Sequence, residues 1–576
     1  MFPKANASFV THFPLEISAY IFSLLPQQDR IQCMDVCQLW RQGVIYGCQA
    51  WRTTELYLFD IDDMIDWLNH VSPIIRHLHI DSQFGSLDPD DIEKAACGDL
   101  DVEDQMLDKQ DMRMAKAIPS HLNKLVSLRF DRLESIHYST DGINGDILQS
   151  LIQLAGSKVR LLNIQAIYRF DIEKKSPCVV SILDQCPQLE TLIDLEPLCD
   201  MVVNDKTSLT PSRIENLELE RRQMVPSDIK LLLSKCACLR RIRLCSWSFI
   251  KMSPMLLLEQ CPRLEIMIWS DASLASLSFY RPEWWRRRTH YDWDDTKLLA
   301  QPSSGLRHLV LDVIDGHACI SNIMHLHHPT LTRLSISIYT NKVPSQEMTW
   351  FPMLLERLDI HVYQDAQQAI ENILRPLVEH CHRLKSISIR TDFRDDDDDA
   401  DPLVLPRWFF VALTSLRDLQ HLVIQVDNDP NDMLQFLEAV PVALESLYYH
   451  GDLIMPCIDA ISNITTLQSL ALATSPEECV NMTPIIKKLQ QLPRLESLAL
   501  KHGKGFNKVG VFQCLAQFPC LRQLFIAIHD QFNVQGIRYL THRQPALETM
   551  VLLDLTWNCK RELTFGHLEK ALRYDM

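Results

Sequence analysis

Glycine is scarce in this sequence, with 15 residues among 576, whereas an average chain contains about 7% glycine. This scarcity argues against a glycine-rich β architecture and against phosphate-cradling loops as a main theme. No run of about 18 apolar residues occurs, which excludes membrane-spanning helices. The first residues also lack the apolar core of a secretory signal. We therefore expect a protein of the cytoplasm and/or nucleus that makes no membrane contact.

Positive charge is also in short supply. Lysine and arginine total 57 against 74 acidic residues, a net charge of −17, and such a chain repels nucleic acid unless a local basic patch intervenes. The 18 cysteines are about 3% of the chain, far below the share in a disulfide scaffold. They form no Cys-x-x-Cys pair at zinc spacing, and no nucleophile-elbow, zinc-protease or phosphate-loop motif is present. The sequence therefore predicts no enzyme, no metal and no cofactor, and it makes nucleic acid an unexpected partner.

The sequence does contain a repeat, an apolar-x-x-apolar-x-apolar hexad. Steps of 25 residues separate the copies at Ile214, Leu239 and Leu264, and steps of 26 recur near the C-terminus. Clear copies begin at Ile214, Leu239, Leu306, Leu331, Leu355, Leu384, Leu419, Leu444, Leu467, Leu495, Leu521 and Leu547, and weaker ones at Ile75, Leu125, Val159, Leu189 and Leu264. A regular period of this length indicates a stack of identical structural units.

Each unit has the pattern of a strand followed by a helix. The last two apolar positions of the hexad alternate with polar ones, as in a strand with one buried face. Helical spacing follows, for example at Val179, Ile182 and Cys186. Because neither piece buries its apolar face alone, the units must stack into a solenoid. We expect an α/β fold with a parallel sheet on the concave side and helices on the convex side.

This repeat resembles the leucine-rich-repeat family. The phrases CPQLETL, CPRLEIM and CHRLKSI are similar to its cysteine-containing class, with Cys186, Cys261 and Cys381 ending a helix just before the next strand. The resemblance covers residues 70–560, with inserts at 84–116, 270–300 and 391–406. The asparagine or cysteine usually found three residues beyond the strand is mostly absent, which is a departure from the family pattern.

Residues 13–46 do not follow the repeat. They predict three short helices, the first with an apolar stripe at Ile17, Ile21, Leu24 and Leu25 and ended by Pro26. Three short helices cannot enclose a sufficient core. An apolar face is therefore expected to be left for a partner.

The same segment resembles an F-box over residues 10–50. The family pattern runs Leu-Pro-x-Glu-Ile, Ile-Phe-Ser-x-Leu, Asp, and then Val-Cys-x-x-Trp. The matching residues are Pro14, Glu16, Ile17, Ile21, Phe22, Ser23, Leu25, Asp29, Val36, Cys37, Trp40 and Arg41. Phe13 replaces the first leucine, and Arg30 stands where a leucine usually follows the aspartate, a departure that would weaken adaptor affinity.

The F-box resemblance implies contact with the small Skp adaptor, and through it with the cullin and RING subunits of a ubiquitin ligase. By resemblance, the adaptor-binding residues are Phe13, Pro14, Leu15, Ile17, Ile21, Phe22, Leu25, Val36 and Trp40. The alternative for each of them is that it only packs inside the helical trio.

One insert combines arginine with tryptophan, the residues that anchor interfaces. Candidate contacts to a target protein are Trp284, Trp285, Arg286, Arg287 and Arg288, together with Arg243 on a repeat strand. Alternation along the strands predicts that Arg243 and Ser335 point outward from the concave face. The tryptophans have two other interpretations, which are to cover the edge of the solenoid or to bind single-stranded nucleic acid. Residues 88–111 carry ten acidic and two basic side chains, which indicates either a solvated loop or a tether for a basic partner.

The whole pattern predicts a substrate-recognition subunit of an SCF-type ubiquitin ligase that binds an unidentified target protein. The alternative is an interaction scaffold with leucine-rich repeats that recruits no ligase.

Overall fold

The computed structural model describes residues 14–46, 51–82, 117–143, 145–169, 179–194, 211–221, 226–246, 255–271, 305–313, 323–338, 350–362, 370–391, 404–440, 443–474, 480–528 and 532–554. The Trp–Arg segment at 284–288 and the acidic residues 88–111 lie outside these ranges. The chain divides into two compact units. The first comprises Met1–Leu264 with Ser270–Ser273, and the second Glu265–Trp269 with Leu274–Met576.

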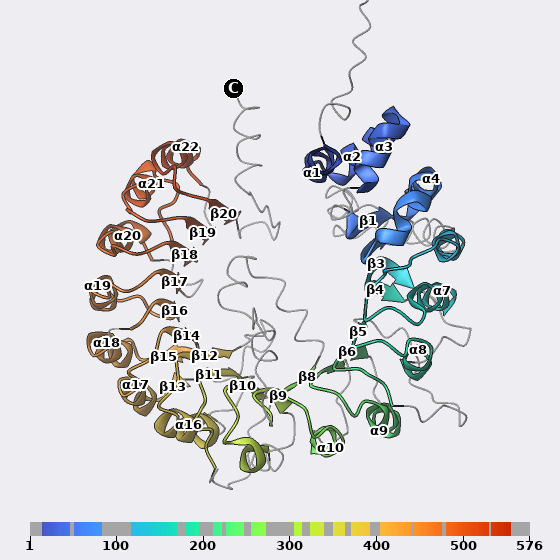
Figure 1. Cartoon of the computed structure of the whole chain (residues 1–576). Helices are drawn as coiled ribbons and strands as arrows, with labels where there is room; N and C mark the ends of the chain where they lie inside the picture. The colour runs from blue at the N-terminus through green and yellow to red at the C-terminus, as the bar shows by residue number, and fades with distance from the viewer. Residues whose placement is uncertain are drawn as a thin grey trace, which may run out of the picture. The chain divides into compact units, whose positions relative to one another are not determined.

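The first unit begins with three helices and continues as a strand–helix ladder (Figure 1). Its helices include α1 (Leu15–Ser23), α2 (Gln27–Val36), α3 (Gln38–Tyr46), α4 (Ile61–Val71), a helix over residues 117–126, α7 (Gly145–Ala155), α8 (Val179–Gln185), α9 (Pro226–Lys235) and α10 (Met255–Gln260). Its strands are β1 (Thr53–Tyr57), β2 (His77–Ser82), β3 (Ser135–Ile143), β4 (Leu161–Arg169), β5 (Thr191–Asp194), β6 (Asn216–Arg221) and β7 (Arg241–Ser246). Short 3-10 turns η3 (Leu58–Asp60) and η4 (Ser72–Ile74) flank α4.

The second unit repeats the strand–helix alternation. Its strands are β8 (Ile266–Asp271), β9 (His308–Val313), β10 (Arg333–Ile338), β11 (Arg357–Val362), β12 (Ser386–Thr391), β14 (His421–Gln425), β16 (Ser446–His450), β17 (Ser469–Ala473), β18 (Ser497–Lys501), β19 (Gln523–Ile528) and β20 (Thr549–Asp554). A separate pair joins β13 (Val404–Leu405) to β15 (Asp427–Asn428). The helices are η6 (Ile370–Leu374), α16 (Arg375–His380), α17 (Arg407–Leu413), α18 (Pro430–Glu438), α19 (Met455–Ser462), α20 (Met482–Leu489), α21 (Val509–Leu515) and α22 (Val534–Arg543).

The expected solenoid class is confirmed. Within each unit, successive strands pair in parallel, and the helices cover one side of the ladder (Figure 1). We call the side of the sheet turned away from the helices the inner face. Pairing keeps equal hexad positions side by side, as at Leu470, Leu498 and Leu524, all fully buried beneath the helices. This register is what a repeated apolar position on one strand face requires.

The hexad marks the strands closely. In sixteen of its seventeen copies a strand begins two residues after the first apolar residue, as Leu239 precedes Arg241. The copy at Leu125 is wrong, because Ile118, Leu122 and Leu125 form the buried stripe of a helix, at i, i+4 and i+7. The neighbouring strand is β3, introduced by Leu133. The ladder also includes β1, which lies before the first recognised hexad and pairs with β2.

Side-chain caps define several helix starts in the second unit. The Asp429 carboxylate accepts a hydrogen bond from the Asn431 amide at the start of α18, at 2.8 Å. Asn481 and Asn533 play the same role for α20 and α22. Such caps satisfy backbone donors that have no partner within the helix. They fix where each helix begins relative to its strand.

The cysteines that stand just before the strands are buried thiols. Cys186, Cys261 and Cys381 are at most 1% exposed, and Cys236 occupies the equivalent place in its repeat. Burial raises the pKa of Cys186 and Cys261 to about 11, and it is the main cause that raises the pKa of Cys236 and Cys381 to about 12. All four are free thiols.

Alkylation of the folded chain is therefore expected to be strongly selective. Iodoacetamide should modify the exposed Cys37 and Cys520 at least about 100-fold faster than the four repeat cysteines, because the thiolate is the reactive form and access is also blocked. Mass spectrometry of tryptic peptides over a time course measures the rates. In denaturant the rates should converge, and equal rates in the folded chain would contradict the burial.

Candidate protein-binding surfaces

The N-terminal helices form a small trio around an aromatic core. Pro14 and Pro26 each stand directly before a helix, and their carbonyls accept the first helical hydrogen bonds. Phe22 of α1 and Trp40 of α3 meet with ring centroids 5.5 Å apart. Met34 and Val44 complete the buried set. The inward side of α1 thus uses Ser18, Ala19 and Phe22, while the large residues of the predicted stripe point elsewhere.

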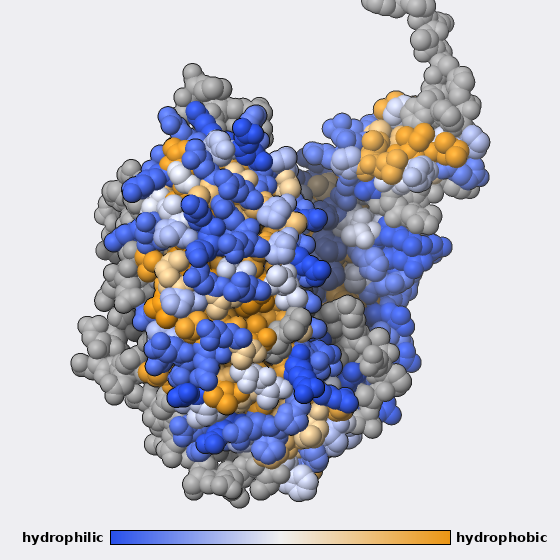
Figure 2. Space-filling model, turned by 90° about the vertical axis from the view of Figure 1, so that its left-hand side faces the viewer, coloured by the Kyte–Doolittle hydropathy of each residue, from blue (hydrophilic) through white to orange (hydrophobic). Residues whose placement is uncertain are grey.

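The helical trio exposes several large apolar side chains. Ile17 is 45% exposed and Val36 60% exposed, and Tyr20, Leu24 and Leu39 are also exposed. Figure 2 shows apolar side chains gathered on the helical trio, at the upper right of the view. We call these five residues the trio patch. Exposed apolar side chains concentrated on such a small helical unit indicate a protein-binding surface.

The sequence-predicted adaptor residues divide into three groups. Pro14, Ile17 and Val36 are exposed, and Ile21, Leu25 and Trp40 are half-buried. Phe22 is 1% exposed and packs inside the trio, so in this structure it supports the surface and does not form it. Phe13 lies outside the described residues, and Leu15 lies in α1 without a described side chain.

Three members of the trio patch were missed as contact residues by the sequence analysis. Tyr20 and Leu39 belong to no part of the family pattern, and Leu24 was placed only in the apolar stripe. The available signal was helical spacing, because Tyr20 and Leu24 follow Ile17 at i+3 and i+7.

Trp51 joins the trio to the first repeat. It is fully buried, donates its indole N–H to the Val44 carbonyl at 3.0 Å, and packs on Trp67 of α4 at 5.3 Å. The Arg30 guanidinium lies 4.7 Å from the Trp51 ring centroid. Arg30 is 8% exposed, and burial lowers its pKa. It therefore belongs to this junction, where its aliphatic stem and cation pack against the indole.

Among the predicted target contacts, Trp284, Trp285, Arg286, Arg287 and Arg288 lie outside the described residues. Arg243 is on β7, half-buried, with its guanidinium 3.6 Å from the Glu218 carboxylate. Arg241 contacts the same carboxylate at 3.0 Å.

The expectation for Ser335 is wrong, because Ser335 is only 3% exposed. Its neighbours in register are Val310 and Asp359. Alternation places a side chain on the inner face, but it does not decide how deeply that face is covered.

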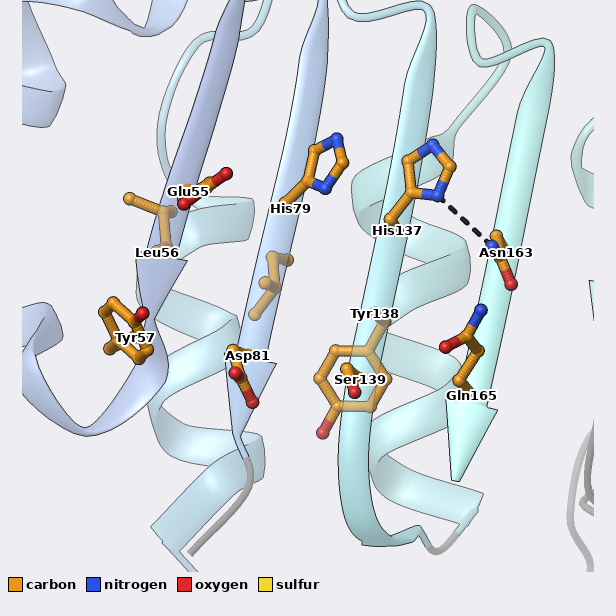
Figure 3. Close-up of a pocket in the computed structure, with 11 residues that line it drawn as sticks. Glu55, Leu56, Tyr57, His79, Asp81, His137, Tyr138, Ser139, Asn163 and Gln165 are labelled. Atoms are coloured by element: carbon orange, nitrogen blue, oxygen red, sulfur yellow. Dashed lines mark hydrogen bonds between the residues drawn. The ribbon is translucent and has the colours of Figure 1, made fainter. Parts of the chain in front are cut away.

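The first four strands create a cavity on the inner face of the first unit. Its volume is about 280 Å³, and its lining comprises Glu55, Leu56, Tyr57, His79, Ile80, Asp81, His137, Tyr138, Ser139, Asn163 and Gln165. Parallel register brings eight of these residues together in two rows (Figure 3). The first row is Glu55, His79, His137 and Asn163, and the second is Tyr57, Asp81, Ser139 and Gln165. We call this site the β1–β4 cavity.

Hydrogen bonds and ring stacking order the first row. The His79 and His137 rings stack with centroids 4.5 Å apart and an interplanar angle of 20°. A hydrogen bond also joins His137 Nδ1 to the side-chain amide nitrogen of Asn163, at 3.2 Å. Burial, with the nearby charges of His79 and His77, lowers the pKa of His137. At neutral pH His137 is therefore an uncharged imidazole.

Acidification is expected to destabilise the chain. Burial is the main cause that lowers the pKa values of His137, His327, His421 and His450. As the pH falls below the ordinary histidine pKa of about 6.5, these four histidines bind protons in the unfolded chain, whereas in the folded chain they stay neutral until the pH is lower. Their contribution to the free energy of unfolding is thus complete above that pH and decreases as the pH approaches the folded-state values.

Thermal unfolding followed by circular dichroism measures this effect. We expect the midpoint to fall steadily from about pH 7.5 to about pH 5.5. Replacing one of the four histidines by glutamine should make the slope shallower. A midpoint that is constant or rises on acidification would contradict the assignment.

No three histidine, cysteine, aspartate or glutamate side chains in the described ranges gather so as to hold a metal ion. Of the helices that the structure describes, none is both long and apolar enough to cross a membrane.

Comparison with known proteins identifies one segment. Residues 10–54 match the family model described as F-box-like. No curated protein matches the chain. One similar solved structure is that of a TLR13–ssRNA13 complex, with 12% sequence identity and a TM-score of 0.33. The match covers 88% of this chain and 59% of the TLR13 chain. This chain therefore spans less than two thirds of the length of the TLR13 chain. The chain carries an F-box-like domain, and its repeated hexads form the parallel strands of a strand–helix solenoid of the leucine-rich-repeat type.

Proposed function

We propose that this protein is the substrate-recognition subunit of an SCF-type cullin–RING ubiquitin ligase. The observation that supports the proposal is the F-box-like domain at residues 10–54, whose helices expose the trio patch. F-box domains generally bind Skp adaptors, and an F-box followed by repeats is typical of adaptor proteins that are not enzymes. The proposal places the protein in the cytoplasm and/or nucleus.

In this proposal the trio binds the Skp adaptor, which recruits the cullin and RING subunits. The contact set consists of the trio patch with Pro14, Ile21, Leu25 and Trp40, and with Phe13 and Leu15 from the family resemblance. Buried apolar contacts of this kind are where binding energy concentrates. Phe22 contributes by holding α1 against α3.

The solenoid holds the target protein on its inner face. Polar side chains of the first unit line that face, including Arg243 and the two rows of the β1–β4 cavity. The Trp–Arg segment at 284–288 is proposed as a further target contact. Transfer of ubiquitin is accelerated because the target is held at a high effective concentration near the ubiquitin-carrying enzyme. No catalytic residue in this chain is needed.

Co-expression with the Skp adaptor, cullin and RING subunits tests the proposal. We expect all four chains to co-purify in one peak on size exclusion. The reconstituted complex should also carry out ubiquitin transfer to proteins that the solenoid retains. A complex with the adaptor alone, which excludes the cullin, would favour the scaffold alternative. The absence of any adaptor complex would contradict the ligase function and would also favour the scaffold.

A further inference from the structure

The proposed adaptor contact set contains no residue of the β1–β4 cavity, and the cavity residues belong to no family motif. We propose that this cavity receives a lysine or arginine side chain from an extended segment of the target protein. The inference rests on the proposed function for the identity of the partner as a ligase target.

The charge of the lining favours a cation. Glu55 and Asp81 contribute two carboxylates, and no lysine or arginine is among the described lining residues. Glu55 is exposed and makes no ion pair with any other described residue. The net charge of −17 further favours the approach of a basic segment. A carboxylate and a guanidinium or ammonium group form the strongest class of hydrogen bond available here.

The same lining disfavours a phosphorylated ligand. Its imidazoles are the only described groups in the cavity that can become cationic, and the lowered pKa of His137 keeps that ring neutral at neutral pH. The arginines farther along the inner face, Arg241 and Arg243, already contact Glu218. A phosphate in the cavity would thus lie near the Glu55 and Asp81 carboxylates, and no lysine or arginine among the described lining residues would offset their charge.

The size of the cavity fits a single side chain. A volume of about 280 Å³ lies just below the range of roughly 300–1,000 Å³ that is typical of small-molecule pockets. Tyr57 is 58% exposed at one end of the second row, and the stacked imidazoles of His79 and His137 provide flat surfaces in the first row. Planar guanidinium groups stack on such rings. We therefore expect arginine to bind more tightly than lysine.

Each of the two rows ends in a neutral polar side chain on β4, at the end of the row farther from Glu55 and Asp81. Asn163 and Gln165 lie on β4, beside His137 and Ser139 (Figure 3). Amide side chains both donate and accept, as peptide groups require. A target segment crossing the strands would thus place its basic side chain at Glu55 and Asp81 and its backbone along β4.

The cavity is also fixed to the F-box-like domain. Gln27 of α2 accepts a hydrogen bond from the Glu55 amide at 3.0 Å and donates to the Glu55 carbonyl. The edge strand of the cavity is therefore held directly by the helical trio. A target bound here would lie at the adaptor-proximal end of the solenoid, within the first unit.

Binding of the chain to immobilised peptide pools tests whether the cavity prefers basic side chains. Immobilised decapeptide pools carry one fixed central residue, which is arginine, lysine, glutamate, phosphoserine or leucine, among randomised neighbours. The full chain is applied in the absence of adaptor, so that the result does not depend on ligase assembly. We expect the arginine and lysine pools to retain about tenfold more protein than the others, as one charge-assisted contact predicts.

Matched variants locate the contact. The double variant Glu55→Gln/Asp81→Asn should lose the preference for basic pools, about tenfold, while still binding the Skp adaptor. The control Glu371→Gln/Glu438→Gln changes the net charge equally at exposed helical positions of the second unit and should keep the preference. Circular dichroism verifies that both variants fold.

Three outcomes would overturn the proposal. They are equal retention of all pools, preference for glutamate or phosphoserine, and loss of the basic preference to the same extent in both double variants. The last result would show that the net charge of the chain, and not the cavity, selects basic peptides. Since adaptor binding is measured separately, failure of this proposal is distinguishable from failure of the ligase function.

Discussion

The double substitution Ile17→Asp/Val36→Asp is expected to abolish capture of the Skp adaptor, with affinity lowered at least about 100-fold. Both side chains belong to the trio patch, one on α1 and one at the end of α2, and both are about half exposed or more in the free chain. In the complex each aspartate would be a buried charge without a partner, which is strongly unfavourable. Biolayer interferometry with the immobilised adaptor measures the change.

A matched control separates loss of the surface from loss of the fold. Val534→Asp places the same charge at a valine that is 50% exposed on α22 of the second unit. This variant should bind the adaptor like the parent chain. The double variant should keep its thermal midpoint, because neither side chain is part of the buried trio core. Adaptor binding that survives the double substitution would mean that the adaptor docks elsewhere.

The repeat architecture could be predicted because its physical cause is local. A strand with one apolar face and a helix with one apolar stripe each show their period in the sequence. Sixteen hexads consequently coincide with strands. Leu125 was misassigned because it ends a helical stripe at i, i+4 and i+7 and is followed by Leu128 and Phe130, which complete a short hexad. The period alone does not distinguish the two when the segment is brief.

The β1–β4 cavity could not be predicted from the sequence. Its residues come from four strands separated by segments of unequal length, so no spacing relates Glu55 to His137. Only the parallel register brings them side by side. How deeply the inner face is covered is equally non-local, and for this reason alternation along the strand did not predict the burial of Ser335.

Family comparison was informative for the trio but incomplete. It located the helices and several exposed apolar residues, yet it assigned Phe22 to the surface, because a motif does not distinguish residues that form a contact from those that support it. It also treated Arg30 as a weakened contact position. The structure directs that side chain onto Trp51 instead, so the departure from leucine has a structural explanation within this chain. Its effect on adaptor affinity stays a prediction.

Trp51→Ala is expected to release the helical trio from the solenoid. The substitution removes a fully buried indole, its hydrogen bond to the Val44 carbonyl, and its contacts with Trp67 and Arg30. Large-to-small changes of this type cost about 3–5 kcal/mol. Because the trio has only a small core of its own, most of this loss should appear as local opening of α1–α3.

Hydrogen–deuterium exchange resolves that local opening, which a global unfolding curve averages over the whole chain. Peptides from α1–α3 should exchange about 100- to 1,000-fold faster in Trp51→Ala, while those from β16–β20 should be unchanged. Trp350→Ala is the matched control, since Trp350 is 44% exposed in the second unit and should leave the trio protected. If exchange in α1–α3 were unaffected by loss of Trp51, the trio would be an independent domain. Adaptor capture by Trp51→Ala should weaken in parallel with the loss of protection, because the trio patch is formed only when α1, α2 and α3 are packed together.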